Sequence, residues 1–213
     1  MTWKVDQTKI LTRDEYARAL LDLRRRADRS EATQVALMVF RLACGCGLRA
    51  SEIAGLNIQD VHVGISRPWI QVRAEIAKGH KGRRVPAWWD ADTLDDLTWW
   101  HDLRTVEHNA GQGQPFVCSL RNGSRGNRLN RHQVRKLFIN ACKGLGKARC
   151  STLTVHDGRH TFVSHALASG RTPAEVMEAA GHASLGTTSI YTHVAVEDDG
   201  TPGNMFARQE HSK

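Results

Sequence analysis

Five polar residues that lie far apart in this sequence would form a phosphoryl-transfer site if the fold brought them together. They are Arg49, His156, Arg159, His182 and Tyr191. An arginine stays charged and can donate paired hydrogen bonds to phosphate oxygens. A tyrosine hydroxyl can attack phosphorus and hold it covalently, while histidines can move the protons. These residue types therefore predict a phosphoryl-transfer site.

The five residues occur in three short motifs. Gly-Leu-Arg-Ala-Ser-Glu spans residues 47–52, His-Asp-Gly-Arg-His spans residues 156–160, and Gly181-His182 is followed nine residues after the histidine by Tyr191. In this order the motifs closely resemble the tyrosine recombinase (phage-integrase-type) family. The resemblance runs from about residue 11 to residue 194, which is nearly the whole chain.

The resemblance implies a role for each of these residues. Arg49 and Arg159 would neutralise charge on the non-bridging phosphate oxygens, as preorganised guanidinium groups can. His182 would hydrogen-bond to the scissile phosphate, and Tyr191 would be the nucleophile. His156 would accept or relay the tyrosine proton, for which a near-neutral pKa is suitable.

Two further residues of these motifs are expected to support the site. Glu52 lies one helical turn after Arg49 and is well placed to orient its guanidinium group, whereas His160 is expected to be a structural hydrogen-bonding residue. A zinc site at His156 and His160 is the alternative, but the glutamate of a His-Glu-x-x-His motif is missing. Gly158 stands where the family usually has a large apolar residue, and no metal site is predicted.

A lysine is expected at the tip of a β-hairpin. Lys78 matches the family lysine in Gly-Lys-Gly-x-Lys, although Ala77 replaces the first glycine. The resemblance implies that its ammonium group protonates the leaving 5′ oxygen as a general acid. Lys81 is the competing candidate for this role. The alternative for both is a turn lysine that binds backbone phosphates.

The distribution of charge indicates a surface for double-stranded DNA. The chain has 30 Lys and Arg against 22 Asp and Glu, a net charge of +8, which suggests a polyanionic partner. No acidic residue occurs from residue 108 to residue 156, where nine cations occur: Arg121, Arg125, Arg128, Arg131, Arg135, Lys136, Lys143, Lys147 and Arg149. The predicted DNA-binding residues are Lys81, Arg83, Arg84, Arg128, Arg131 and Arg135.

Composition favours an intracellular protein. Hydrophobic residues make up 40% of the chain and charged residues 24%, as is usual for a globular domain. The longest apolar run, residues 35–40, is far too short to span a bilayer, so no membrane association is expected. The five scattered cysteines include no Cys-x-x-Cys pair and predict reduced thiols in the cytoplasm.

The expected fold is α+β and mainly helical, with a small antiparallel sheet that carries the lysine hairpin. A capping box at residues 12–15 predicts a helix start, and Asp90 and Asn130 are predicted N-caps. Further helices are expected over 32–43, 51–56, about 159–168 and 173–180. Strands are expected over 69–73 and 83–86, on either side of a turn.

We expect residues 1–213 to form a single catalytic domain, with a core over about 11–194 and a C-terminal tail over 195–213. The N-terminal DNA-clamping domain of the family is expected to be absent from this chain. The resemblance implies a homotetramer on DNA and a monomer in its absence. In the tail, residues 198–203 should break a helix, which leaves Met205 and Phe206 as anchors for docking.

The predicted function is a site-specific DNA recombinase or integrase that cleaves and rejoins DNA through a 3′-phosphotyrosyl intermediate. The bond energy is kept in the phosphotyrosine, so this chemistry needs neither ATP nor a metal ion, and no cofactor is predicted. One alternative is a type IB topoisomerase-like nicking and closing enzyme, which the same residues would support. Another is a DNA-binding protein with an inactive site.

Overall fold

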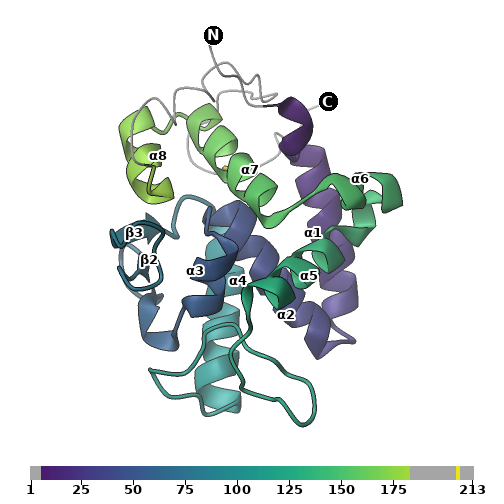
Figure 1. The fold of residues 1–213 in the computed structure, drawn as a ribbon, viewed down its shortest axis with the longest axis vertical. Coiled ribbons are helices and arrows are strands. Elements are labelled where there is room, and N and C mark those ends of the chain that lie inside the picture. Colours follow the sequence, from purple (N-terminus) through teal and green to yellow (C-terminus); the bar gives the residue numbers. More distant parts are fainter. Residues whose placement is uncertain (1–5, 183–204, 207–213) are drawn as a thin grey trace.

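The chain folds into a mainly helical body with one small antiparallel sheet (Figure 1), which confirms the expected fold class. The computed structural model describes residues 6–182 and 205–206. The α-helices in these ranges are α1 (Arg13–Ala27), α2 (Glu31–Phe40), α3 (Ala50–Gly55), α4 (Ala91–Asp102), α5 (Arg131–Ala141), α6 (Lys147–Thr152), α7 (Val155–Ala168) and α8 (Pro173–Ala180). Short 3-10 turns cover Gln7–Lys9, Ile58–Asp60 and Cys142–Leu145. None of these helices is long and apolar enough to cross a bilayer.

Side-chain caps start three of these helices where the sequence predicts them. At α1, the Thr12 hydroxyl accepts from the Glu15 amide at 3.1 Å, and the Glu15 carboxylate accepts from the Thr12 amide at 3.0 Å. Asp90 accepts from the Thr93 amide at the start of α4, and Asn130 caps α5 in the same way. These bonds satisfy amide groups that have no partner within the helix.

Helix α2 forms the centre of the core, where it packs against α1 and α5. Its residues from Val35 to Phe40 are all buried, as expected for a helix that is apolar on every side. The helix continues as a π-helical turn, Arg41–Gly45, so the helix predicted over 32–43 is confirmed with a wider final turn. All five cysteines are buried and free.

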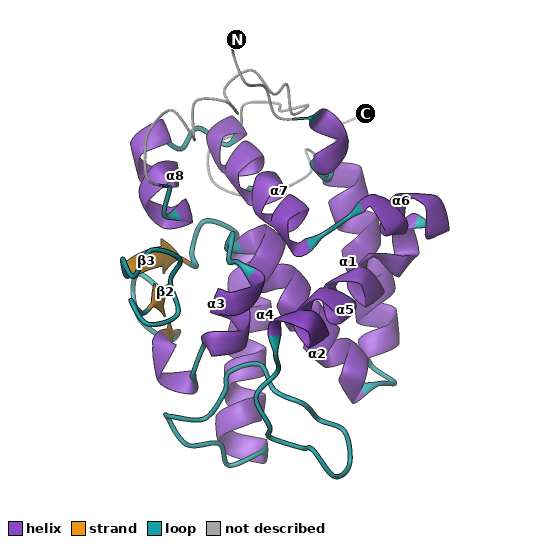
Figure 2. Cartoon of the chain, in the orientation of Figure 1, coloured by secondary structure: helices purple, strands orange, loops and turns teal. Residues whose placement is uncertain are grey.

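The sheet has three antiparallel strands in the order β1 (Val61–His62), β2 (Trp69–Val72) and β3 (Arg83–Pro86) (Figure 2). Val72 pairs with Arg83, so β2 and β3 form the predicted hairpin. Strand β1 was not predicted, because two residues are too few to show an alternating pattern. Helix α8 packs beside β3, which brings the end of that helix to the sheet (Figure 1).

Helix α7 begins at Val155 and not near Arg159, where the sequence predicted its start. Thr154 and Asp157 form a capping box, so His156 lies in the first turn of the helix. A β-carbon at Gly158 would lie 3.0 Å from each of three neighbouring side chains, those of Ala43, Cys44 and Phe138. The glycine therefore allows α7 to pack closely on the π-helical turn and α5, where a large apolar side chain would not fit.

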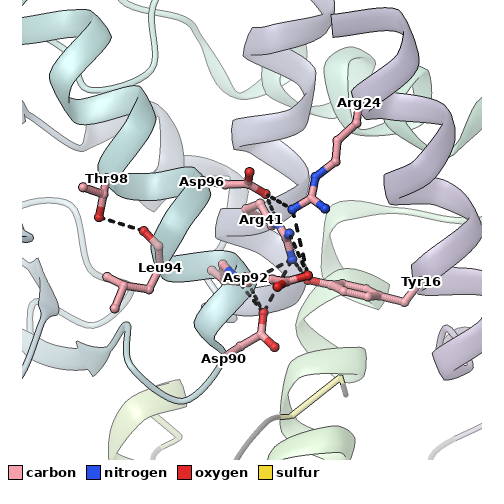
Figure 3. Close-up of polar contacts among 9 residues, drawn as sticks. Tyr16, Arg24, Arg41, Asp90, Asp92, Leu94, Asp96 and Thr98 are labelled. Atoms are coloured by element: carbon pink, nitrogen blue, oxygen red, sulfur yellow. Dashed lines mark hydrogen bonds and ion pairs between the residues drawn. The ribbon is translucent and has the colours of Figure 1, made fainter. Parts of the chain in front are cut away.

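A buried arginine joins three parts of the core (Figure 3). The Arg41 side chain is fully buried, and its Nε donates to Asp96 at 2.6 Å. Its Nη1 donates to the hydroxyl groups of Tyr16 at 2.8 Å and Thr93 at 3.2 Å and lies 3.5 Å from the Asp90 carboxylate. These contacts connect the π-helical turn after α2 to α1 and α4.

Met205 and Phe206, the expected anchors of the tail, pack against the same chain. Met205 is fully buried, and its amide donates to the Trp89 carbonyl at 3.3 Å. The Phe206 ring stacks on Tyr16 with 3.7 Å between ring centroids and lies 4.9 Å from the His165 ring. These two described residues of the tail therefore pack on Trp89 and on α1 of the same chain.

Candidate active site

Arg49 is held at the start of α3 by a tight turn. Gly47 has φ +65°, and a β-carbon there would lie 2.4 Å from the Phe162 ring. This position therefore requires a glycine, both for its backbone conformation and for the close approach to α7. Arg49 follows as the N-cap residue of α3 in an extended conformation. The Gly-Leu-Arg motif thus fixes the backbone from which the arginine side chain extends.

Glu52 is fully buried below Arg49, and its four acceptor positions are all used. Its Oε1 accepts from Arg49 Nη1 at 2.9 Å and from Arg83 Nη1 at 2.8 Å. Its Oε2 accepts from the Arg49 amide at 2.9 Å and from Arg83 Nη2 at 2.8 Å. Burial alone would raise the pKa of Glu52, but the hydrogen bonds and charge of Arg83, and then those of Arg49, lower it to about 2. The carboxylate therefore stays ionised and holds Arg49 through two hydrogen bonds.

Arg83 was predicted to contact DNA, and its position in the structure does not fit that role. Its side chain is only 6% exposed, and its guanidinium group forms a bidentate ion pair with the Glu52 carboxylate. Its Nε donates to the Ala179 carbonyl of α8 at 2.8 Å. A signal for this position was present in the sequence, because Arg83 and Val85 alternate with Arg84 and so share the inward face of β3.

Arg159 lies on α7 and is almost completely buried. Its Nη1 donates to the Gly47 carbonyl at 2.7 Å, and its Nη2 donates to the Ala180 carbonyl. At the end of α8, three successive carbonyl oxygens accept from three arginines: Ala179 from Arg83, Ala180 from Arg159 and Gly181 from Arg49 at 3.5 Å. The C-terminal end of a helix carries partial negative charge and favours cations. It therefore holds both predicted catalytic arginines together.

His182 follows this helix end directly. Gly181 adopts a left-handed conformation, φ 64° and ψ 49°, and the His182 amide donates to the Met177 carbonyl at 3.0 Å. Burial, followed by the positive charges of Arg159 and Arg49, lowers the pKa of His182 to about 3. His182 is therefore neutral at pH 7 in the free protein, and it lies within electrostatic reach of both arginines.

His156 and His160 lie one turn apart on α7, with 4.5 Å between their ring centroids in an edge-on arrangement. Partial burial and then the charge of Arg159 lower the pKa of His156, and burial followed by His156 lowers that of His160 to about 4. Among the described residues, no group of three or more His, Cys, Asp or Glu side chains could hold a metal ion. The two rings thus belong to the same cationic site as Arg159.

Lys78 and Lys81 are both exposed in the turn between β2 and β3. The turn is tight, with positive φ at Gly79 and His80. The charge of Lys78 contributes to the lowered pKa of His156, which places this lysine within electrostatic reach of the site. Tyr191, the predicted nucleophile, lies outside the described residues.

Arg84 lies on the outer face of the sheet, opposite to Arg83. Its guanidinium carbon is 4.2 Å from the centre of the Trp69 ring, and the Trp69 ring stacks on His62 at 3.9 Å. A guanidinium group on an aromatic face is restrained and stays charged. Arg84 is therefore a restrained cation on the exposed face of the sheet, two strands from His62.

The remaining predicted DNA-binding arginines differ in their surroundings. Arg131 and Arg135 are exposed on α5. Arg128 instead donates to the carbonyl groups of Ala54 and Leu56 at 2.9 and 3.2 Å, and to the Asn57 side chain at 2.6 Å. These bonds hold the C-terminal end of α3, a structural role that the sequence did not predict.

Two other cations of the acid-free stretch also pair with acids from outside it. Arg125 contacts Glu31 at 2.6 Å, and Arg149 contacts Glu15 at 2.7 Å. Fewer cations of this stretch are therefore available to contact DNA phosphates than the sequence suggests.

Comparisons with known proteins agree with this architecture. Residues 9–198 match the sequence profile of the Phage integrase family. The tyrosine recombinase XerC of Neisseria meningitidis serogroup B is 35% identical over 154 residues, which cover 72% of this chain and 46% of that protein. XerC of Corynebacterium glutamicum is 34% identical over 157 residues, covering 74% of this chain and 46% of the relative. The chain thus spans about half the length of these relatives.

Solved structures show the same fold at lower identity. The XerA recombinase is 24% identical with a TM-score of 0.67, covering 87% of this chain and 58% of that one. The XerH site-specific recombinase, in a pre-cleavage complex with its difH substrate, is 23% identical with the same TM-score, covering 92% of this chain and 53% of that one. The family profile covers far more than half of the chain, in the region that holds all three motifs. The chain belongs to the phage integrase family.

Proposed function

We propose that this chain is the catalytic domain of a tyrosine recombinase, which cleaves and rejoins DNA strands at specific sites. The observation that carries the proposal is the meeting of Arg49, Arg159 and His182 at the C-terminal end of α8. The two guanidinium groups come from different helices, so their association depends on the tertiary fold. Two fixed guanidinium groups can stabilise the charge that develops on a phosphorane-like transition state.

In the proposed reaction, the Tyr191 hydroxyl oxygen attacks the scissile phosphorus and His156 takes up its proton. The bond between phosphorus and the 5′ oxygen breaks, and Lys78 supplies the proton that converts the leaving group to a 5′ hydroxyl. The DNA is then held as a 3′-phosphotyrosyl ester. A 5′ hydroxyl from a partner strand reverses these steps. The phosphotyrosine conserves the energy of the broken bond, so this sequence of steps requires neither ATP nor a metal ion.

The lowered pKa of His156 supports its place in this scheme. A neutral imidazole is needed to accept the tyrosine proton, and partial burial together with Arg159 favours that form. Tyrosine has a high pKa and is a poor nucleophile by itself, so it depends on such a base and on the cationic pocket.

We propose double-stranded DNA as the partner. The net charge of +8 supports this, as do Lys81, Arg84, Arg131 and Arg135, whose side chains are exposed and suitable for phosphate contacts. XerH and lambda integrase have been solved in complex with DNA. By analogy, four copies of this chain would assemble on a recombination site, while the protein without DNA would be monomeric. The buried free thiols suit the reducing cytoplasm, where we place the protein.

A nicked suicide substrate tests the proposal. Cleavage next to the nick releases a short oligonucleotide that diffuses away, so the covalent complex accumulates and is visible on a denaturing gel. We expect a covalent complex with the wild-type protein in EDTA and without ATP, and none with Tyr191→Phe, which should still bind the DNA. A wild-type protein that binds the substrate but forms no covalent complex would contradict the proposal.

A further inference from the structure

The Arg83 guanidinium group contacts the carboxylate that holds Arg49 and the helix end that precedes His182. Its Nη1 and Nη2 donate to the two oxygens of Glu52, and its Nε donates to the carbonyl group of Ala179, all at 2.8 Å. Glu52 in turn holds Arg49, and Ala179 lies three residues before His182. One planar group therefore connects α3, β3 and the end of α8.

These contacts leave little freedom for the elements that they join. Arg83 and Glu52 are only 6% and 0% exposed, so solvent cannot replace their bonds. A β-carbon at Gly181 would lie 2.7 Å from Arg83 Cδ, which shows how closely the arginine stem packs under the turn before His182. The planar fork of an arginine fits two carboxylate oxygens at once, which a lysine cannot do.

We infer that Arg83 is a positioning residue that fixes Arg49 against the scissile phosphate by holding Glu52 and the end of α8 in place. The inference rests on the proposed function of the site. It replaces the role in DNA binding predicted from the sequence, because the side chain is not available to phosphates. Arg83 itself touches none of the reacting atoms in this account.

Loss of Arg83 should slow the reaction most when the scissile phosphate carries its normal charge. Without Arg83, half of the hydrogen bonds to Glu52 are lost and the carboxylate no longer has a fixed orientation, so Arg49 is misplaced. A misplacement of about 1 Å in a catalytic group can cost about 100-fold in rate. The loss should matter most where Arg49 is needed to neutralise a non-bridging oxygen.

The experiment uses suicide substrates with either a normal scissile phosphodiester or a methylphosphonate, in which an uncharged methyl group replaces one non-bridging oxygen. The two methylphosphonate diastereomers are tested separately. The rate of covalent complex formation is measured for wild type, Arg49→Ala, Arg83→Met and Arg83→Lys. Arg83→Lys keeps a charge beside Glu52 and remains informative if Arg83→Met does not fold. Arg73→Met is the matched control. Arg73 forms a similar ion pair with Asp60, with 2.9 Å between the nitrogen and the oxygen, and this pair does not include Glu52.

We expect Arg83→Met to be slower than wild type by at least about tenfold on the phosphodiester. On the methylphosphonate diastereomer that Arg49→Ala tolerates best, the same variant should lose much less. Arg83→Lys should show the same pattern more weakly, and Arg73→Met should change the two rates by equal factors. Arg83→Met should slow the Arg49→Ala variant by a smaller factor than it slows the wild type, because Arg83 acts in part through Arg49.

Equal losses of Arg83→Met or Arg83→Lys on both substrates, or no loss on the phosphodiester, would overturn the inference and leave the proposed function intact. If the wild-type protein forms no covalent complex with any substrate, the proposed function fails and the inference fails with it. DNA affinity, measured on the same substrates before cleavage, separates these effects from binding.

Discussion

The Glu52 carboxylate lies in a fully buried position and accepts four hydrogen bonds from Arg49 and Arg83. Its pKa is about 2 in the folded protein, against 4.5 for an ordinary glutamate. A lowered pKa contributes stability that is fully present above the unfolded value and is lost as the pH falls toward the folded value. The relevant pH window therefore runs from about 4.5 down to about 2.

We expect Glu52→Gln to reduce the free energy of unfolding by about 3 kcal/mol at pH 7, since each pKa unit corresponds to about 1.4 kcal/mol. At pH 3 the difference from wild type should fall to about half, because wild-type Glu52 then loses part of its advantage. Urea unfolding between pH 7 and pH 3 measures this. A difference that stays constant over the whole range would show that the charge of Glu52 is not what stabilises the fold.

Lys78 can be distinguished from Lys81 by the leaving group. A substrate in which sulfur replaces the bridging 5′ oxygen needs no proton on departure, because a thiolate leaves readily. Lys78→Ala should be slow on normal DNA, by about 100-fold or more for loss of a general acid, and largely rescued on the sulfur substrate. Lys81→Ala should weaken binding and affect both substrates equally. If Lys81→Ala shows the rescue instead, Lys81 is the acid.

At the scale of the elements, helix α5 presents two of the predicted DNA-binding cations with exposed side chains, Arg131 and Arg135. Arg131→Ala and Arg135→Ala should each lower the steepness of log affinity against log salt concentration by about 0.9. With one phosphate contact fewer, the protein releases fewer counterions when it binds. The effect should be similar on specific and random duplexes, since phosphate contacts carry no sequence information. Fluorescence anisotropy across a salt series measures the slopes. Unchanged slopes for both variants would mean that this face of α5 points away from DNA.

Arg128→Ala is the comparison within the same stretch. Because Arg128 donates to the Ala54 and Leu56 carbonyl groups, its loss should reduce stability by about 1 kcal/mol, the usual net contribution of a hydrogen bond. The Leu56 carbonyl keeps a second donor, the Phe116 amide. Its salt slope should stay close to that of the wild type. A lowered slope with unchanged thermal stability would return Arg128 to the DNA-binding surface.

Local sequence signals predicted the elements that depend on local interactions. The capping box at Thr12 and the caps at Asp90 and Asn130 each act within four residues, and each helix starts where expected. The early start of α7 was missed because Gly158 disfavours a helix. Packing of that glycine against α5 and the π-helical turn overrides its low helix propensity. One of the residues that it packs against, Ala43, lies more than 100 residues before it in the sequence.

The same distinction applies to the candidate site. The motifs identified Arg49, Arg159 and His182, and the fold brings them together at one helix end. The burial of Arg83 depends on Glu52 and on Ala179, which are 31 and 96 residues away, so the charge pattern alone misassigned it to the surface. A run of cations in sequence does not show which of them already have partners in the fold.

For the molecule as a whole, the buried Arg41 cluster connects the first, second and fourth helices. Arg24 shares the Asp96 carboxylate with Arg41, but it is 48% exposed (Figure 3). We expect Arg41→Met to cost about 3–5 kcal/mol, because the change leaves the buried Asp90 carboxylate without its cation and Asp96 with the exposed Arg24 alone. Arg24→Met should cost less than about 1 kcal/mol, as exposed ion pairs usually do. Chemical denaturation of the two variants provides the comparison, and equal losses would contradict it.

The central claim is that Tyr191 carries the DNA during the reaction. The covalent complex formed on a nicked suicide substrate can be digested with protease and nuclease, and the modified peptide identified by mass spectrometry. The account predicts a nucleotide attached through its 3′ phosphate to Tyr191 and a free 5′ hydroxyl on the released strand. An adduct on any other residue, or one linked through a 5′ phosphate, would contradict it.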